Sequence, residues 1–163
     1  MNLFLLDDDL RKSAEFHCDK HMKLGLEATQ VVCTVLHGQG HNVPYKPTHK
    51  NHPLTKWAAV DNENLKFVAH YAESIFYEYT YRFGKIHKSS IVLNTVILLV
   101  SDIEKPLKFN VRTFPVCVAP ECIIPGYAVA SHRLNYVYHK SHLFKWTKRK
   151  EPYWIKEICS LNT

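Results

Sequence analysis

A long helical pattern near the start of the chain is LRKSAEFHCDKHMKLGLEATQVVCTVLH, which covers residues 10–37. Apolar or small residues recur in it at spacings of three or four: Ala14, Cys18, Met22, Gly25, Ala28, Val32 and Val35. This period is typical of a helix with one buried face. Aspartates at positions 7–9 suit a helix start, because carboxylates accept backbone N–H bonds and are favoured at the positive end of the helix dipole. The sequence therefore predicts one long helix over 10–37, preceded by a short extended apolar segment at 3–6.

A second helical pattern runs from 54 to about 85. Its predicted inward face consists of Trp57, Leu65, Val68, Ala72, Ile75 and Tyr79. Residues 38–52 before it are rich in Gly, Pro, Asn and His, which predicts a loop. Pro53 suits the first position of a helix and Gly84 suits its end. We expect this helix to be the central one.

Two more helices are predicted in the second half of the chain. Ser89 and Ser90 are expected to cap a helix that continues to about residue 100. Another helix is expected over 127–144, and its predicted inward residues are Leu134, Val137 and Tyr138. Between these helices, 109–125 contains three prolines and predicts an irregular crossing.

Length and composition indicate one folded domain. The chain has 163 residues, of which 46% are hydrophobic and 22% charged, close to the averages for globular proteins. We therefore predict an all-α fold, a single compact domain over 1–163 with about four main helices. A basic and aromatic C-terminal segment, 145–163, is expected to pack on it.

Charge and cysteine content suggest a partner and a compartment. Lys and Arg outnumber Asp and Glu by 21 to 15, a net charge of +6, which favours nucleic acid or a phosphorylated nucleotide as partner. Five cysteines without a CxxC pair favour a reducing compartment. The first residues lack the features of a secretory signal. The longest apolar run, 91–100, is shorter than the roughly 20 residues that a bilayer requires, so we expect no membrane contact.

The polar face of the first predicted helix carries the first candidate site. His17, Lys20, Lys23, Glu27 and Gln30 recur at spacings of three and four. A carboxylate among ammonium and imidazole groups is a workable acid–base arrangement, and the alternative is a solvated surface with a Lys23–Glu27 pair. His17 and His21, four apart, could also bind a metal, but no clear third ligand accompanies them. We expect neither metal nor cofactor, and the predicted catalytic residues are Glu27, His17 and His21.

Three further clusters are candidates for binding phosphate or nucleotide. The loop YKPTHKNHP, residues 45–53, precedes a helix start, where anions are favoured. The second cluster covers 78–88, and the third is an aromatic and basic patch at 146–149, of a kind that stacks on unpaired bases. The alternatives are a polar connecting loop, an exposed ion pair and a basic tail that packs on the core. The predicted binding residues are Lys20, Tyr45, Lys46, His49, His52, Arg82, Lys85, His87, Trp146 and Lys148.

Two common enzyme classes are poorly supported. The chain has no GxxxxGK phosphate loop and no GxSxG elbow. Nucleotide-triphosphatase and serine-hydrolase chemistry are therefore not expected.

Several strings together resemble a known group of proteins. These strings are HCDKH at 17–21, YKPTHKNHP at 45–53, EYTYRFGK at 78–85 and KWTKR at 145–149. They look like a group of small proteins that tailed phages and large DNA viruses encode, mostly without assigned function. The resemblance implies a viral protein in the host cytoplasm.

The order of elements is also similar to the phage pyrimidine-dimer DNA glycosylases, or endonuclease V. In that family the N-terminal amine attacks the sugar carbon, a Glu on the first helix assists, and basic residues hold a kinked duplex with a flipped base. Carried over to this chain, the amine is that of Met1 or Asn2 and the carboxylate is Glu27.

Three hypotheses follow. The first is a DNA glycosylase and lyase, in which basic side chains contact phosphates and Tyr45 or Trp146 stacks on a base. The second is a viral counter-defence protein that cleaves or sequesters a host nucleotide messenger in a pocket of His17, His21, His49, His52 and Arg82. The third is a non-catalytic module that binds a host protein through its C-terminal segment.

Overall fold

A computed structural model describes residues 2–108 and 113–160, and these residues form an all-α protein without a strand. The helices are α1 (Leu10–Phe16), α2 (Leu24–Gly38), α3 (Pro53–Ala58), α4 (Asn62–Phe83), α5 (Lys88–Val96), α6 (Ala128–Lys140) and α7 (Tyr153–Ser160). Short 3-10 segments supplement them: η1 (Asp19–Lys23), η2 (Ile97–Leu99), η4 (Pro120–Cys122) and η5 (Ser141–Leu143). The predicted fold class is confirmed, with more and shorter helices than expected.

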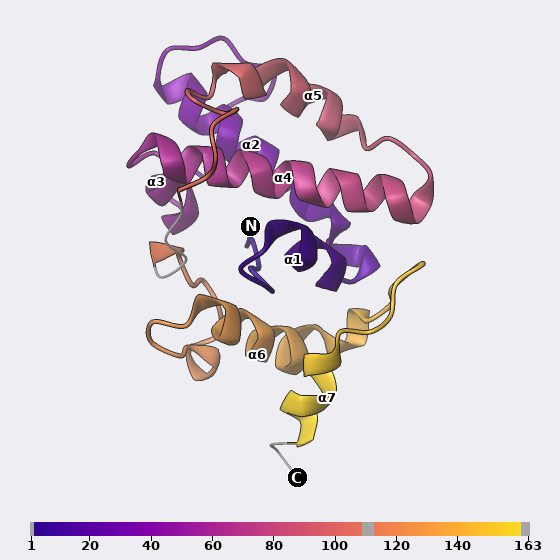
Figure 1. Cartoon of the computed structure of the whole chain (residues 1–163). Helices are drawn as coiled ribbons and strands as arrows, with labels where there is room; N and C mark the ends of the chain where they lie inside the picture. The colour runs from indigo at the N-terminus through magenta and orange to yellow at the C-terminus, as the bar shows by residue number, and fades with distance from the viewer. Residues whose placement is uncertain (1, 109–112, 161–163) are drawn as a thin grey trace.

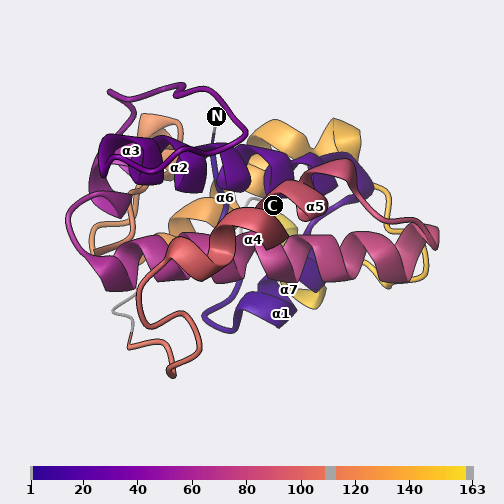
Figure 2. The same ribbon diagram turned by 90° about the horizontal axis from the view of Figure 1, so that it is seen from above.

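The helices form two layers around the N-terminal segment. Helix α4 packs against α1, α2, α3 and α5, and α6 packs against α7. Figure 1 shows α2 to α5 on one side, α6 and α7 on the other, and the N-terminal residues with α1 between them. The view from above shows how α4 crosses the width of the molecule (Figure 2). One continuous cluster of buried apolar side chains extends from Leu3 to Ile155.

The prediction of one helix over 10–37 is wrong, because the chain leaves the helical conformation at His17 and Cys18. The backbone groups freed there have tertiary partners: Arg82 donates to the His17 carbonyl, and the Cys18 amide donates to the Tyr136 hydroxyl. Tertiary bonds therefore replace the helical ones at the break. The whole predicted apolar stripe is nevertheless buried, because η1 and α2 continue it.

The second predicted helix is also divided, into α3 and α4. Pro53 opens α3 as expected, and Asp61 caps α4 by accepting from the Asn64 amide at 2.8 Å. Gly84 ends α4 in the left-handed conformation, with φ of 63°, which confirms its predicted role.

Two details of the second half differ from the prediction. His87, and not Ser89, is the N-cap of α5, since its Nδ1 accepts from the Ser89 amide. Tyr138 was predicted to face inward but is 43% exposed. Residues 113–125 are irregular apart from η4, as predicted, whereas the first part of that crossing, 109–112, lies outside the described residues.

The described helices were also compared with the requirements of a bilayer. None of those within 2–108 and 113–160 combines the length and the apolarity needed to cross a membrane.

Candidate functional site

The N-terminal segment, residues 3–6, is a stretch of non-helical backbone in the middle of an all-helical protein. Its four side chains are at most 4% exposed. Such a segment has no sheet partner, so side chains must satisfy its polar groups. The Tyr71 hydroxyl donates to Phe4 O (3.0 Å), Leu5 N to His132 Nδ1 (3.2 Å), Leu6 N to Ser13 Oγ (2.9 Å) and Arg133 Nε to Leu6 O (2.8 Å). Residues of α1, α4 and α6 thus fix the segment from both layers.

Three buried histidines surround this segment: His17, His21 and His132. The Nδ1–H of His17 donates to Ser13 O at 2.7 Å, and its Nε2 lies 3.2 Å from the Tyr71 hydroxyl oxygen. The Nδ1 of His21 lies 2.6 Å from the Tyr136 hydroxyl, and the ring of Phe4 contacts that of His21.

The environment keeps these three imidazoles neutral. Burial, with a smaller effect of His21, lowers the pKa of His17 to about 3. Burial also lowers the pKa of His21 and of His132 to about 4. His132 must be unprotonated at Nδ1 to accept from Leu5. The predicted catalytic residues His17 and His21 therefore lie in the interior, as supports of the N-terminal segment.

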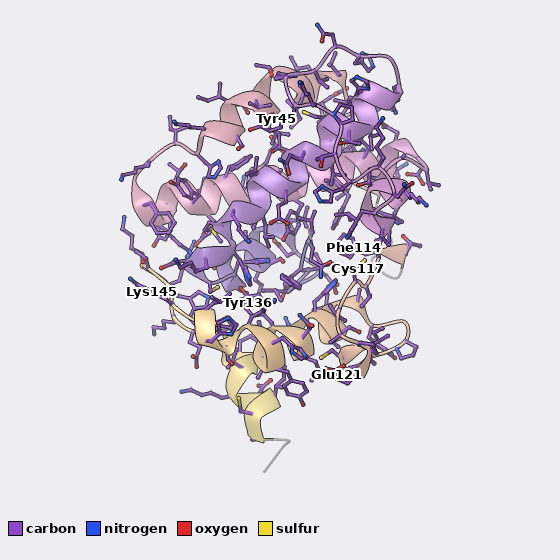
Figure 3. The ribbon with its side chains drawn as sticks, turned by 180° about the vertical axis from the view of Figure 1, so that it is seen from behind. Tyr45, Phe114, Cys117, Glu121, Tyr136 and Lys145 are labelled. Carbon is purple, nitrogen blue, oxygen red and sulfur yellow. The ribbon has the colours of Figure 1, made fainter. Side chains whose placement is uncertain are left out.

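The fixed segment places Asn2 at Glu27. The Asn2 backbone nitrogen donates to Glu27 Oε2 at 3.2 Å, and the Asn2 side-chain amide donates to the Cys117 carbonyl. Glu27 lies in the first turn of α2, and its side chain is 20% exposed. Lys23 lies 3.8 Å from its other oxygen. Figure 3 shows Cys117 beside Phe114 on the segment that leads to α6. A carboxylate accessible to solvent thus meets the first residues of the chain.

The face of α2 that carries Glu27 also carries the predicted binding loop. Thr34 is seven residues further on, which places it on nearly the same face, about 10.5 Å along the axis. Its hydroxyl donates to Thr48 O and accepts from Thr48 N, each at 3.1 Å. At the loop start, the Tyr45 hydroxyl donates to Ser89 at 3.0 Å. The loop is therefore held against α2 at Thr34, about two helical turns from Glu27.

The loop side chains divide into exposed and structural groups. Lys46, His49 and Lys50 are exposed. His52 caps α3, because its Nδ1 accepts from the Leu54 amide at 3.2 Å. Lys50 also borders a hollow of about 390 Å³ between α2 and α3, together with His37, Lys56, Thr34 and Thr55. The exposed groups give this side of α2 a cationic surface.

Arg82, predicted to contact phosphate, is instead a buried tie between distant segments. It is 1% exposed and donates to Glu78, Asp19 and the carbonyls of Glu15 and His17. Arg149 makes two bonds to Glu78, each of 2.9 Å. Burial alone would raise the pKa of Glu78, but these hydrogen bonds from Arg149 and Arg82 lower it below its ordinary value.

The C-terminal candidates Trp146 and Lys148 belong to the same network of hydrogen bonds between distant segments. Burial alone would raise the pKa of Asp19, but hydrogen bonds from Thr147 and Arg82 lower it. The Trp146 indole donates to Phe16 O at 3.0 Å, and the Lys148 ammonium donates to Tyr81 O at 3.1 Å. Residues of the strings 78–85 and 145–149 thus connect α1, α4 and the C-terminal segment by hydrogen bonds.

The other predicted binding residues are placed as follows. Lys20 and Lys85 are exposed, on η1 and just after α4. His87 is half-buried against the rings of Phe76 and Tyr79, and burial lowers its pKa. Of the predicted binding lysines, Lys20 lies in the turn immediately before α2, whereas Lys46 belongs to the loop whose Thr48 is bonded to Thr34 of α2.

The sequence analysis missed three residues of this region: Tyr71, Cys117 and His132. Tyr71 and His132 lie on helices where no spacing distinguishes a hydroxyl or imidazole aimed at the N-terminal segment from an ordinary core side chain. Asn2 was named only through the resemblance to the glycosylases, as one of two residues that could carry the amine.

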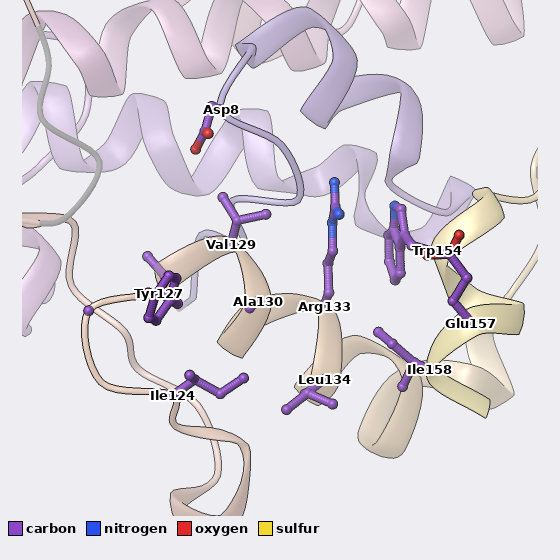
Figure 4. Close-up of a pocket in the computed structure, with 12 residues that line it drawn as sticks. Asp8, Ile124, Tyr127, Val129, Ala130, Arg133, Leu134, Trp154, Glu157 and Ile158 are labelled. Carbon is purple, nitrogen blue, oxygen red and sulfur yellow. The ribbon is translucent and has the colours of Figure 1, made fainter. Parts of the chain in front are cut away.

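Another hollow, of about 610 Å³, lies between α6 and α7 (Figure 4). It is mostly apolar, and Arg133 and Trp154 stand at its inner end. None of the predicted site residues lines it.

Comparison of the chain with family models, with curated proteins and with solved structures gave no match. The geometry and chemistry of the residues are therefore the basis for a functional proposal.

Proposed function

We propose that this protein is a DNA-processing enzyme that removes a damaged or modified base and then cleaves the strand, as a glycosylase with lyase activity. The observation that carries the proposal is the hydrogen bond of 3.2 Å from the backbone amide of Asn2 to Glu27, which places the first described residue of the chain at a carboxylate. The nucleophile is the α-amino group that the mature chain carries at Met1 or Asn2. Viral origin and action in the host cytoplasm are part of the proposal, and rest on the sequence resemblance.

The chemistry needs an unprotonated amine beside a carboxylate. An α-amino group has an ordinary pKa of about 7.7–8.0, so part of it is unprotonated near neutral pH. Its nitrogen attacks C1′ of the target nucleotide, the bond from C1′ to the base breaks, and the base leaves with that electron pair. Glu27 accepts the proton that the amine loses. Opening of the sugar ring, in which O4′ takes up a proton, gives an imine. In the β-elimination that follows, C2′ loses a proton to solvent, and the C3′–O bond breaks with departure of the 3′-phosphate.

The burial of residues 3–6 supports this arrangement. A nucleophile on a free chain end is poorly oriented, whereas fixed geometry lowers the entropic part of the barrier. Four side-chain bonds to this segment restrict the end of the chain to the vicinity of Glu27. His17 and His21 act in this proposal as positioning residues, through Tyr71 and Phe4.

In this proposal, exposed lysines beside α2 contact the DNA. Lys20 and Lys23 belong to the turn before α2, with Lys23 at 3.8 Å from Glu27. Lys46 and Lys50 belong to the loop that is bonded to Thr34 further along α2. Lysines spread along one helix suit a phosphate backbone that passes beside it.

The test is borohydride trapping on duplexes that contain an abasic site or ultraviolet damage, because borohydride reduces the imine to a stable protein–DNA adduct. Glu27→Gln should lower the trapping rate by about 10²-fold or more, the usual contribution of general acid–base catalysis. Glu157→Gln, an exposed carboxyl on α7, is the matched control and should trap normally. Selective acetylation of the α-amine should abolish trapping.

Two outcomes would contradict the proposal. One is the absence of any adduct with the unmodified protein on either duplex. The other is equal trapping after acetylation of the α-amine or after Glu27→Gln.

The geometry supports the two alternative functions less well. The nucleotide pocket requires His17, His21 and Arg82 to face the same cavity as His49 and His52, but the first three are at most 4% exposed. The host-protein module requires a free C-terminal segment, whereas Trp146 and Arg149 are bonded to α1 and α4.

A further inference from the structure

The segment before α6 carries side chains for which the proposed function has no role. Residues 114–124 contain one short 3-10 segment, η4. Hydrogen bonds hold this segment on α6: among them, Ala119 N donates to Asn135 Oδ1 at 3.2 Å, and Ile124 N donates to Ser131 Oγ at 2.8 Å.

Three potential metal ligands meet where η4 contacts the last turns of α6. They are the Glu121 carboxylate, the Cys122 thiol and the His139 imidazole, and their donor atoms all lie within 4.8 Å of one another. The Nε2–H of His139 donates to Glu121 Oε1 at 2.9 Å. Cys122 is fully buried, whereas Glu121 and His139 are exposed at the rim (Figure 3 labels Glu121).

We propose that Glu121, Cys122 and His139 form a binding site for one Zn²⁺ ion. Sulfur, imidazole nitrogen and carboxylate oxygen are the three donor types that zinc takes in proteins, with bonds of about 2.3, 2.0–2.1 and 2.0–2.2 Å. At the tetrahedral angle these bonds place donors roughly 3.3–3.8 Å apart. Rotation of the exposed Glu121 and His139 side chains closes the remaining distance, and water completes the fourth position.

Charge and proton balance also fit. The thiolate and the carboxylate together neutralise the ion. Binding displaces the thiol proton of Cys122 to solvent, while His139 coordinates as a neutral ring through Nε2 with its proton on Nδ1. The ordinary alternative for these residues is a surface His–Glu pair beside a core cysteine, and that alternative takes up no metal.

The structural consequence is a clamp between η4 and α6. Cys117, five residues before Cys122, accepts the hydrogen bond from the Asn2 side chain. A metal that fixes η4 therefore also fixes the wall of the Asn2–Glu27 site. The zinc site itself does not depend on the proposed function.

The experiment is titration of the full-length metal-free protein with Zn²⁺ by calorimetry, and with Co²⁺ by absorption spectroscopy. We expect one ion per chain, a thiolate-to-cobalt absorption band in the near ultraviolet and a higher melting temperature with zinc. Cys122→Ser should remove the band, and His139→Ala should weaken zinc binding on the order of tenfold or more. Controls are Cys159→Ser and His142→Ala, an exposed cysteine and histidine outside the cluster.

The variants separate binding from folding. His139 is 41% exposed, so His139→Ala is expected to fold normally even if Cys122→Ser does not. The proposal is overturned if the unaltered protein takes up no zinc at micromolar concentration. It is equally overturned if His139→Ala binds as tightly as the His142→Ala control.

Discussion

The protein contains two histidine-rich regions that look alike in sequence and differ completely in structure. Around residues 3–6, His17, His21 and His132 are buried, neutral and bonded to backbone or hydroxyl groups. In the loop 45–52, His49 is exposed and His52 half-buried as a helix cap. The first region orders the chain end, and the second supplies a polar surface beside it.

The contrast between buried and exposed histidines indicates that imidazole has two separate tasks in this protein. In the interior it offers one donor and one acceptor in a compact ring, which suits backbone groups without a partner in regular structure. At the surface it remains available to an anion. The following experiments test whether the two tasks are separable.

The largest expected effect is acid sensitivity of the interior region. A histidine whose pKa is lowered on folding takes up a proton only on unfolding, so it destabilises the fold as pH falls below the unfolded value of 6.5. The loss continues to the folded values of about 4 for His21 and His132 and about 3 for His17. Each contributes up to about 1.4 kcal/mol per pH unit. Denaturant unfolding at pH 7.5, 6.5, 5.5 and 4.5 measures this loss.

His132→Gln tests the contribution of one histidine to this pH dependence. The amide oxygen of Gln can also accept from Leu5 but takes up no proton. The variant should reduce the pH slope between 6.5 and 4.5 by up to about 1.4 kcal/mol per pH unit, and His49→Gln, at an exposed histidine, is the matched control. A stability that is flat across this pH range would refute the description of the interior histidines as neutral supports.

The next effect concerns Arg82, which the sequence grouped with the surface cations. Arg82→Leu leaves the buried Glu78 with Arg149 alone and removes the partners of two carbonyls. Breaking a buried ion pair in this way costs about 3–5 kcal/mol of unfolding free energy. Lys85→Ala, an exposed cation after α4, should change it by less than about 0.5 kcal/mol. Equal stability of the two variants would remove the distinction between interior and surface.

A smaller effect is expected from Tyr71→Phe. The ring remains, but Phe4 O loses its donor and His17 Nε2 loses its hydroxyl neighbour. An unsatisfied buried polar group costs about 1–3 kcal/mol. Tyr77→Phe is the control, since Tyr77 is 59% exposed and Arg11 contacts only its ring. If both variants unfold at the same denaturant concentration, the hydroxyl does not hold the segment.

The apolar pattern predicted the helices better than the polar pattern predicted the site. The stripe from Ala14 to Val35 is buried throughout, because burial depends on spacing that the sequence displays. The break at His17 and Cys18 depends on bonds to Arg82 and Tyr136, which are 65 and 118 residues away, so no local pattern reveals it. Similarly, nothing local distinguishes Glu78 and Arg82 as a buried tie from an exposed pair on a helix surface.

The smallest effect on folding, and the most informative one for function, is expected at the loop. Lys46→Gln should alter stability by less than about 0.5 kcal/mol, because the side chain is exposed. If Lys46 contacts a phosphate, the variant should bind duplex DNA more weakly, and the slope of log K against log salt should fall by about 0.9. Lys156→Gln on α7 is the matched control and should keep the full slope. Equal slopes for the two variants would mean that the loop does not contact the phosphate backbone, and would direct the search for the duplex to Lys20 and Lys23 on the other side of Glu27.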